Sequence, residues 1–169
     1  GSEMCIRDRD NMARLFRMAD FPVVCANYDV SATVLKDLVK PYVVFERDGV
    51  KIGVLGLGCQ LEGMVQANKC VGVVYNDPVT VANEVAAVLK EKEGCDVVVC
   101  LSHLGVQYDE NQLIPKTRNI DVILGGHSHT FMKGPKTLLN MDGKNVSLMH
   151  TGKSGIYVGQ MDLTLEKKK

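Results

Sequence analysis

The alternation of apolar and polar residues divides the chain into short strands and a few helices. Apolar residues at helical spacing between Asp10 and Ala19 predict a helix that ends at Phe21-Pro22. Runs of β-branched residues predict strands at residues 23–26, 42–45, 50–57, 97–101, 121–125, 137–140, 146–150 and 156–165. Most of these strands are short, so the fold has to combine them in sheets.

The segments between the strands predict how they are connected. Asp77 suits the N-cap of a second helix, because Pro78 follows at the first helical position and Gly94 closes the pattern. A third helix, near residues 109–118, is expected to be irregular because it contains Pro115. Asp48-Gly49 and Asp142-Gly143 are typical hairpin turns. Strand–helix–strand units in the middle with hairpins at both sides predict a mixed α/β domain with helices outside the sheets.

The first residues do not have the character of a natural domain start. Gly1-Ser2 resembles a cloning remnant, and the following residues, as far as Arg9, resemble translated sequencing adapter. We therefore expect the fold to begin near residue 10, and residues 10–169 to belong to one domain.

Composition excludes several classes of partner. The chain has 20 basic and 20 acidic residues and no net charge, so it lacks the basic field that attracts nucleic acid. No apolar run is long enough for a membrane helix, and no signal peptide is visible. The 6 cysteines form no Cys-x-x-Cys pair. Cys25 and Cys100 lie inside apolar runs, which favours buried free thiols and hints at a reducing compartment.

Histidines are concentrated where two predicted strands end. The strand at 121–125 runs into Gly125-Gly126 and then His127 and His129, while the strand at 97–101 runs into His103. Successive parallel strands are usually neighbours, so we expect the three imidazoles to gather at one sheet edge. Imidazole suits zinc, iron, manganese, cobalt or nickel. Because residues two apart in a turn point in different directions, His127 and His129 favour two adjacent metal ions.

Other polar residues favour structural roles. His150 is expected to pack structurally, and Asp109, Glu110 and Asp121 are expected to be solvated or to cap elements. Neither Ser102 nor Ser128 has the context of a nucleophile elbow. The glycines between residues 53 and 58 lack the complete phosphate-loop fingerprint.

Two motifs resemble the C-terminal motifs of calcineurin-like metallophosphoesterases, in the branch of the 5′-nucleotidases and 2′,3′-cyclic-nucleotide phosphodiesterases. They are Leu101-Ser102-His103-Leu104-Gly105 and Ile120-Asp121-Val122-Ile123-Leu124-Gly125-Gly126-His127-Ser128-His129-Thr130. The resemblance extends over about residues 10–165. Supporting segments are Phe21-Pro22-Val23, Ala26-Asn27, Pro41-Tyr42, residues 51–56 and Gly152-Lys153-Ser154-Gly155.

The resemblance implies a phosphoric ester hydrolase with two divalent metal ions about 3.5–4 Å apart and a metal-bound hydroxide. His103 and His127 would ligate one ion and His129 the other. The family's Asp-x-His, bridging Asp and Gly-Asn-His motifs do not occur in the sequence, so no catalytic set is complete. The chain is therefore expected to be the C-terminal half of an αββα four-layer sandwich, with the N-terminal half missing. Metal binding and activity of this fragment are expected to be weak or absent.

The resemblance also implies a phosphate-ester substrate of the nucleotide type and a periplasmic or cell-surface location, in contrast to the thiol count. An uncovered sheet face would favour self-association or pairing with the missing half. One alternative is a non-catalytic half-domain or a metal-binding, interaction scaffold. Another is a mononuclear, histidine-rich zinc site unrelated to phosphatases.

Overall fold

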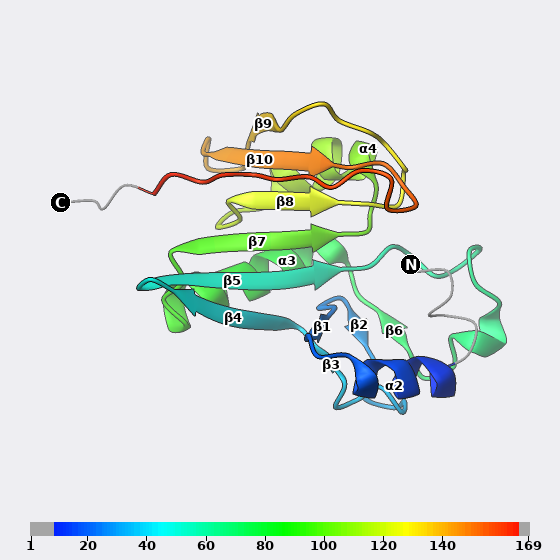
Figure 1. Cartoon of the computed structure of the whole chain (residues 1–169). Helices are drawn as coiled ribbons and strands as arrows, with labels where there is room; N and C mark the ends of the chain where they lie inside the picture. Colours follow the sequence, from blue (N-terminus) through cyan, green and yellow to red (C-terminus); the bar gives the residue numbers. More distant parts are fainter. Residues whose placement is uncertain (1–8, 166–169) are drawn as a thin grey trace.

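The centre of the fold is a six-stranded sheet, shown in Figure 1. The computed structural model describes residues 9–165. In spatial order the strands are β4 (Tyr42–Arg47), β5 (Val50–Leu57), β7 (Val97–Ser102), β8 (Val122–Gly125), β10 (Asn145–His150) and β9 (Lys136–Leu139). Strands β5, β7, β8 and β10 are parallel, and the hairpin strands β4 and β9 are antiparallel to their neighbours. The predicted mixed α/β class is confirmed.

Two small sheets lie beside the carboxyl end of β5. Strand β1 (Val23–Val24) pairs in parallel with β3 (Val39–Lys40), and β2 (Tyr28–Asp29) pairs antiparallel with β6 (Val74–Tyr75). The predicted strand at residues 23–26 is therefore only two residues long.

Helix α2 (Arg9–Met18) precedes these sheets, and the 3₁₀ turn η1 (Ala67–Lys69) precedes β6. The helix begins at the last residue of the expected artefact, residues 1–9. Residues 1–8 lie outside the described residues, so the origin of that segment stays a prediction.

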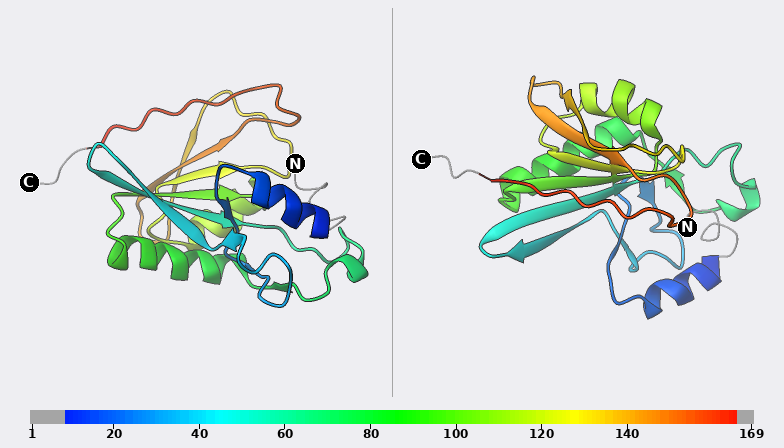
Figure 2. Two further views of the ribbon diagram at one scale, coloured as in Figure 1. Left: turned by 60° about the horizontal axis from the view of Figure 1, so that its bottom comes forward. Right: turned by 45° about the horizontal axis from the view of Figure 1, so that its top comes forward.

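Helices cover one face of the central sheet (Figure 2). Helix α3 (Pro78–Ala87) continues into the π-helical η2 (Val88–Lys92), and its N-cap is Asp77, as predicted. The irregular helix comprises α4 (Val106–Tyr108), η3 (Asp109–Leu113) and α5 (Ile114–Lys116). The core between these helices and the sheet is fully buried and aliphatic; it includes Ala82, Ala86, Leu89, Leu113, Ile114, Leu55, Ile123 and Leu148. One sheet and one helical layer are consistent with part of the predicted sandwich.

The opposite face of the sheet carries exposed apolar side chains. Leu101 and Leu124 occupy paired positions on β7 and β8, and each is 41% exposed. The segment 156–165 runs on this side of the sheet (Figure 2), but it is not a strand, so that prediction is wrong. The segment has the alternation of a strand, but no strand among residues 9–165 pairs with its backbone N–H and C=O groups. No helix in the described range is long and apolar enough to cross a membrane.

Candidate metal site at the carboxyl edge of the sheet

Three neighbouring parallel strands deliver potential metal ligands to one edge of the sheet. Cys59 follows β5, His103 follows β7, and His127 follows β8. One ligand atom from each residue lies within 4.8 Å of the other two. Within residues 9–165 this is the only such group of His, Cys, Asp and Glu side chains, and it contains no carboxylate. Two imidazoles and a thiol are donors that suit a divalent transition metal such as zinc.

The two histidines lie against each other. Their ring centroids are 5.1 Å apart, and the ring planes meet at 69°. The backbone N–H of His103 donates to the carbonyl of Leu57 at 2.8 Å, so the sheet ladder continues past β7 and fixes the loop. A Cβ at Gly126 would be 3.2 Å from Nδ1 of His103. Glycine at that position therefore leaves room for the His103 ring.

His127 occupies a strained turn. The N–H of Ser128 donates to the carbonyl of Gly126 at 2.9 Å, and His127 between them has φ of 69°. This is a γ-turn with a left-handed central residue, a conformation that is rare outside glycine. The N–H of Gly126 in turn donates to the carbonyl of Ser102 at 2.8 Å. Backbone strain of this kind concentrates at functional sites, where the surrounding structure holds it in place.

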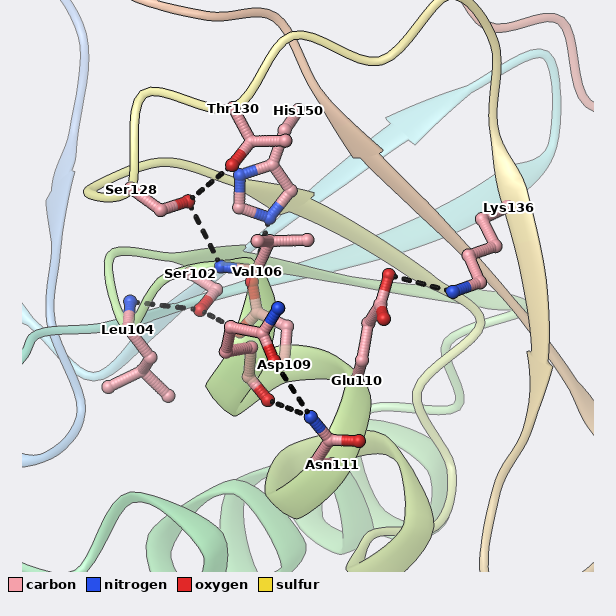
Figure 3. A network of polar contacts seen from close by, with 11 residues as sticks. Ser102, Leu104, Val106, Asp109, Glu110, Asn111, Ser128, Thr130, Lys136 and His150 are labelled. Atoms are coloured by element: carbon pink, nitrogen blue, oxygen red, sulfur yellow. Dashed lines mark hydrogen bonds and ion pairs between the residues drawn. The ribbon is translucent and has the colours of Figure 1, made fainter.

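A buried polar network lies directly beneath these loops (Figure 3). The carboxylate of Asp109 accepts from Ser102 Oγ at 2.6 Å and contacts His150 Nε2 at 2.9 Å. All three residues are buried, with exposures of 0% for Asp109, 4% for Ser102 and 1% for His150. The prediction that Asp109 is solvated or caps an element is wrong, whereas the structural role predicted for His150 is confirmed. The network connects the ends of β7 and β10 to the irregular helix.

Gly125 makes this network possible. A Cβ at Gly125 would fall inside contact distance of His150 Nε2 and would be 2.6 Å from Cδ2 of the same ring. The His150 ring thus lies over β8 at the point where that strand ends, and reaches Asp109 from there. The two consecutive glycines therefore accommodate two different histidines, Gly125 for His150 and Gly126 for His103.

The loop after β8 is also held from the helix side. Ser128 Oγ accepts from the N–H of Val106 at 3.1 Å and lies 3.0 Å from the hydroxyl of Thr130, as Figure 3 shows. Gly105 has φ of 95° and approaches the His127 ring and Ser128. The loops after β7 and β8 therefore support each other through hydrogen bonds close to the histidine pair.

The loop after β5 is held by a buried amide. Asn27 is fully buried; its Nδ2 donates to the carbonyl of Gly58 at 2.9 Å, and its Oδ1 accepts from the N–H of Gly58 at 2.8 Å. The hydroxyl of Tyr28 donates to the carbonyl of Cys59. Hydrogen bonds therefore hold the peptide groups on both sides of the Gly58 Cα, directly before Cys59 in the chain.

An open pocket extends from the site across the uncovered face. It is lined by Val24, Cys25, Leu57, Gly58, residues 101–103 and residues 124–126. Burial raises the pKa of the Cys25 thiol to about 11, so Cys25 is a neutral thiol at pH 7. All five cysteines in the described range are free thiols. The prediction of a buried free thiol is confirmed for Cys100, whereas Cys25 is only partly buried.

The sequence prediction and the structure differ in one member of the site. His103 and His127 lie together as predicted, but the exposed His129, with φ of 55°, is outside the group. Its assignment to a second metal ion stays a prediction. Cys59 was missed, although it follows the end of a predicted strand. The signal that could have found it is the position of β5 next to β7 in a parallel sheet.

Sequence comparison identifies relatives that are named as phosphoesterases or nucleotidases. The chain is 28% identical to the trifunctional nucleotide phosphoesterase YfkN of Bacillus subtilis over 90% of its own length and 11% of that protein. It is 33% identical to a 5′-nucleotidase of Vibrio cholerae over 69% of its length and 24% of that protein. No protein-family model matches.

Solved structures give the same result. The 5′-nucleotidase precursor of Thermus thermophilus superposes with a TM-score of 0.75 at 31% identity, over 82% of this chain and 29% of that one. The calcineurin-like phosphoesterase YfkN superposes with a TM-score of 0.61 at 28% identity, over 74% of this chain and 41% of that one. The chain thus spans between 11% and 41% of the length of these relatives.

Proposed function

This chain belongs to the 5′-nucleotidase family of calcineurin-like phosphoesterases, and we propose that its sheet edge supplies part of a two-metal site for hydrolysis of phosphate esters. The observation that carries the proposal is the pair of imidazoles of His103 and His127, held within ligand distance of each other at that edge. His103 and His127 would hold one ion, and His129 would hold the second.

The surrounding residues act by fixing these ligands. Hydrogen bonds to the ends of β5 and β7 hold both loops, and the buried Asp109–His150 pair supports them from below. Ligands placed in advance lose little conformational entropy when they bind. When bound, divalent metal would supply Lewis acidity toward a phosphoryl oxygen and would acidify a water molecule.

Residues 9–165 do not supply a full two-metal ligand set. The resemblance implies a bridging carboxylate, and the donor group at this edge contains none. We therefore propose that the remaining ligands come from residues outside this sequence, which would form the other layers of the sandwich. This chain by itself should then release little phosphate. The names of its relatives indicate nucleotides as the substrate class.

A second candidate is an interaction module without catalysis. The exposed Leu101 and Leu124 on the uncovered sheet face favour it, because a neighbouring layer or a second copy could bury them. The two candidates differ in whether the histidines are needed for function.

Phosphate release from adenosine monophosphate tests the proposal. The protein assayed is the product of the natural reading frame that contains residues 10–165. With zinc, manganese or cobalt present, wild-type protein should hydrolyse the substrate, and the His127→Asn variant should lose at least about 100-fold in rate. Asparagine is chosen because it tolerates the left-handed backbone of position 127. Equal activity in the variant and the wild type would refute the role of His127. Absence of turnover in both, with intact folding, would favour the interaction module.

A further inference from the structure

We infer that Cys59 is a third ligand beside His103 and His127, so that one metal position of this site is a thiolate–imidazole site. The inference rests on the proposed metal site and goes beyond it, because the ligands expected from the sequence are histidines alone. It names a metal class: a cysteine with two histidines selects zinc-like ions over manganese or magnesium.

The distances allow a single ion to be shared. Ligand atoms of the three residues already lie within 4.8 Å of one another. A tetrahedral zinc ion with bonds of about 2.0–2.3 Å places its donor atoms about 3.5 Å apart. Side-chain torsions that shorten these separations by about 1 Å therefore complete three corners of the tetrahedron. The rest of the coordination sphere stays available for the ligands proposed to come from outside this sequence and for water or substrate.

The second observation is that the backbone carrying Cys59 is fixed in position. The buried Asn27 amide bonds both the N–H and the carbonyl of Gly58, and Tyr28 bonds the carbonyl of Cys59. A Cβ at Gly58 would be 2.7 Å from Cε2 of Tyr28, so a larger residue would displace this support. The Cys59 side chain can therefore rotate toward the histidines while its backbone stays in place.

The half-buried position of Cys59 suits a ligand better than a core thiol. Cys95 and Cys100 are buried among aliphatic residues, whereas Cys59 is partly exposed and its Sγ lies 3.9 Å from the Met64 sulfur. On metal binding the S–H bond breaks, the sulfur forms the bond to the metal, and the proton passes to solvent. Metal binding should therefore release protons and should shield Cys59 from alkylation.

Cobalt(II) titration of the full 169-residue chain tests the inference, because a thiolate ligand gives a sulfur-to-cobalt charge-transfer absorption that imidazole does not. Wild-type protein and the Cys70→Ser control should show this band. Cys59→Ser should lack it and bind cobalt about 100-fold more weakly, because loss of an outer-shell partner alone costs about 10–100-fold. Zinc should protect Cys59, but not Cys70, from iodoacetamide in peptide mass spectra.

The outcomes separate the inference from the function on which it rests. Cobalt bound without the charge-transfer band, and lost in His127→Asn, would overturn the role of Cys59 and keep the histidine pair. A band that persists in Cys59→Ser but disappears in Cys25→Ser would overturn it in favour of the neighbouring thiol. No cobalt binding by the wild-type chain would overturn the three-residue site, whereas the proposed function, which needs further ligands, is decided by the phosphate-release assay. Unchanged urea midpoints would show that each variant is folded.

Discussion

Substitution of Gly125 by alanine should destabilise the whole domain, because its methyl group would overlap the His150 ring. The ring is 1% exposed, and its Nε2 lies 2.9 Å from the Asp109 carboxylate, so the ring cannot turn away without losing that contact. Overpacking of a buried site costs about 1–3 kcal/mol. Loss of a buried hydrogen bond to a carboxylate costs about 1.5–3 kcal/mol more. We expect Gly125→Ala to lower the free energy of unfolding by about 3–5 kcal/mol.

Urea denaturation followed by circular dichroism measures this effect. With a slope of about 2 kcal/mol per molar urea, the midpoint should fall by about 1.5–2.5 M. Gly134→Ala is the matched control, because a Cβ at Gly134 meets nothing within 4 Å. The control should change stability by less than about 0.5 kcal/mol.

A double-mutant cycle identifies the cause. In a His150→Ala background the added methyl group no longer meets a ring, so Gly125→Ala should cost about 2–3 kcal/mol less than in the wild type. Equal midpoints for Gly125→Ala and Gly134→Ala would refute the argument. An additive cycle would show that the cost comes from the backbone of β8 rather than from the His150 ring.

Four further predictions concern the site, a helix cap, a core thiol and the uncovered face. Gly126→Ala should weaken zinc binding about tenfold in equilibrium dialysis, while the urea midpoint stays near that of the wild type. The reason is that the added Cβ would be 3.2 Å from Nδ1 of His103, a metal ligand in the proposed site. Equal zinc affinities of variant and wild type would refute this. Asp77→Ala should cost about 1 kcal/mol at pH 7, because the Asp77 side chain accepts from the N–H of Thr80 at 2.8 Å. The hydrogen bonds from Thr80 lower the pKa of Asp77 below its unfolded value, so this stabilisation is present above about pH 4 and is lost as the pH falls further; a gap between wild type and variant that is constant from pH 7 to pH 3 would contradict the linkage. Burial raises the pKa of Cys100, so iodoacetamide should modify it only in urea, and rapid native labelling by mass spectrometry would contradict its burial. Light scattering should show concentration-dependent association that decreases in Leu124→Glu; a monodisperse wild-type monomer would count against an uncovered interaction face.

The elements predicted well were those specified by neighbouring residues. The cap at Asp77-Pro78 and the hairpin turns at Asp48-Gly49 and Asp142-Gly143 depend on local backbone preferences, and all three are present in the structure. The segment 156–165 has the alternation of a strand but no partner among the described residues. Pairing is a non-local property, and alternation alone does not reveal it.

The site was predictable as far as strand order allowed. Placing His103 next to His127 required only that two successive parallel strands be neighbours. Asp109 was not predictable as a buried residue, because its partners Ser102 and His150 are 7 and 41 positions away. Cys59 required knowing that β5 lies directly beside β7. The positions of Asp109 and Cys59 in the site both depend on contacts between segments that are far apart in the sequence.

The most direct test of the metal site is the zinc content of the purified chain and its His127→Asn variant, measured after equilibrium dialysis against buffered zinc. The group of Cys59, His103 and His127 predicts one zinc ion per wild-type chain, in contrast to the weak binding expected from the sequence. The variant should lose that ion while its urea midpoint stays unchanged. Equal zinc content in both proteins would contradict the assignment of His103 and His127 as ligands of a shared metal ion at the carboxyl edge of the sheet.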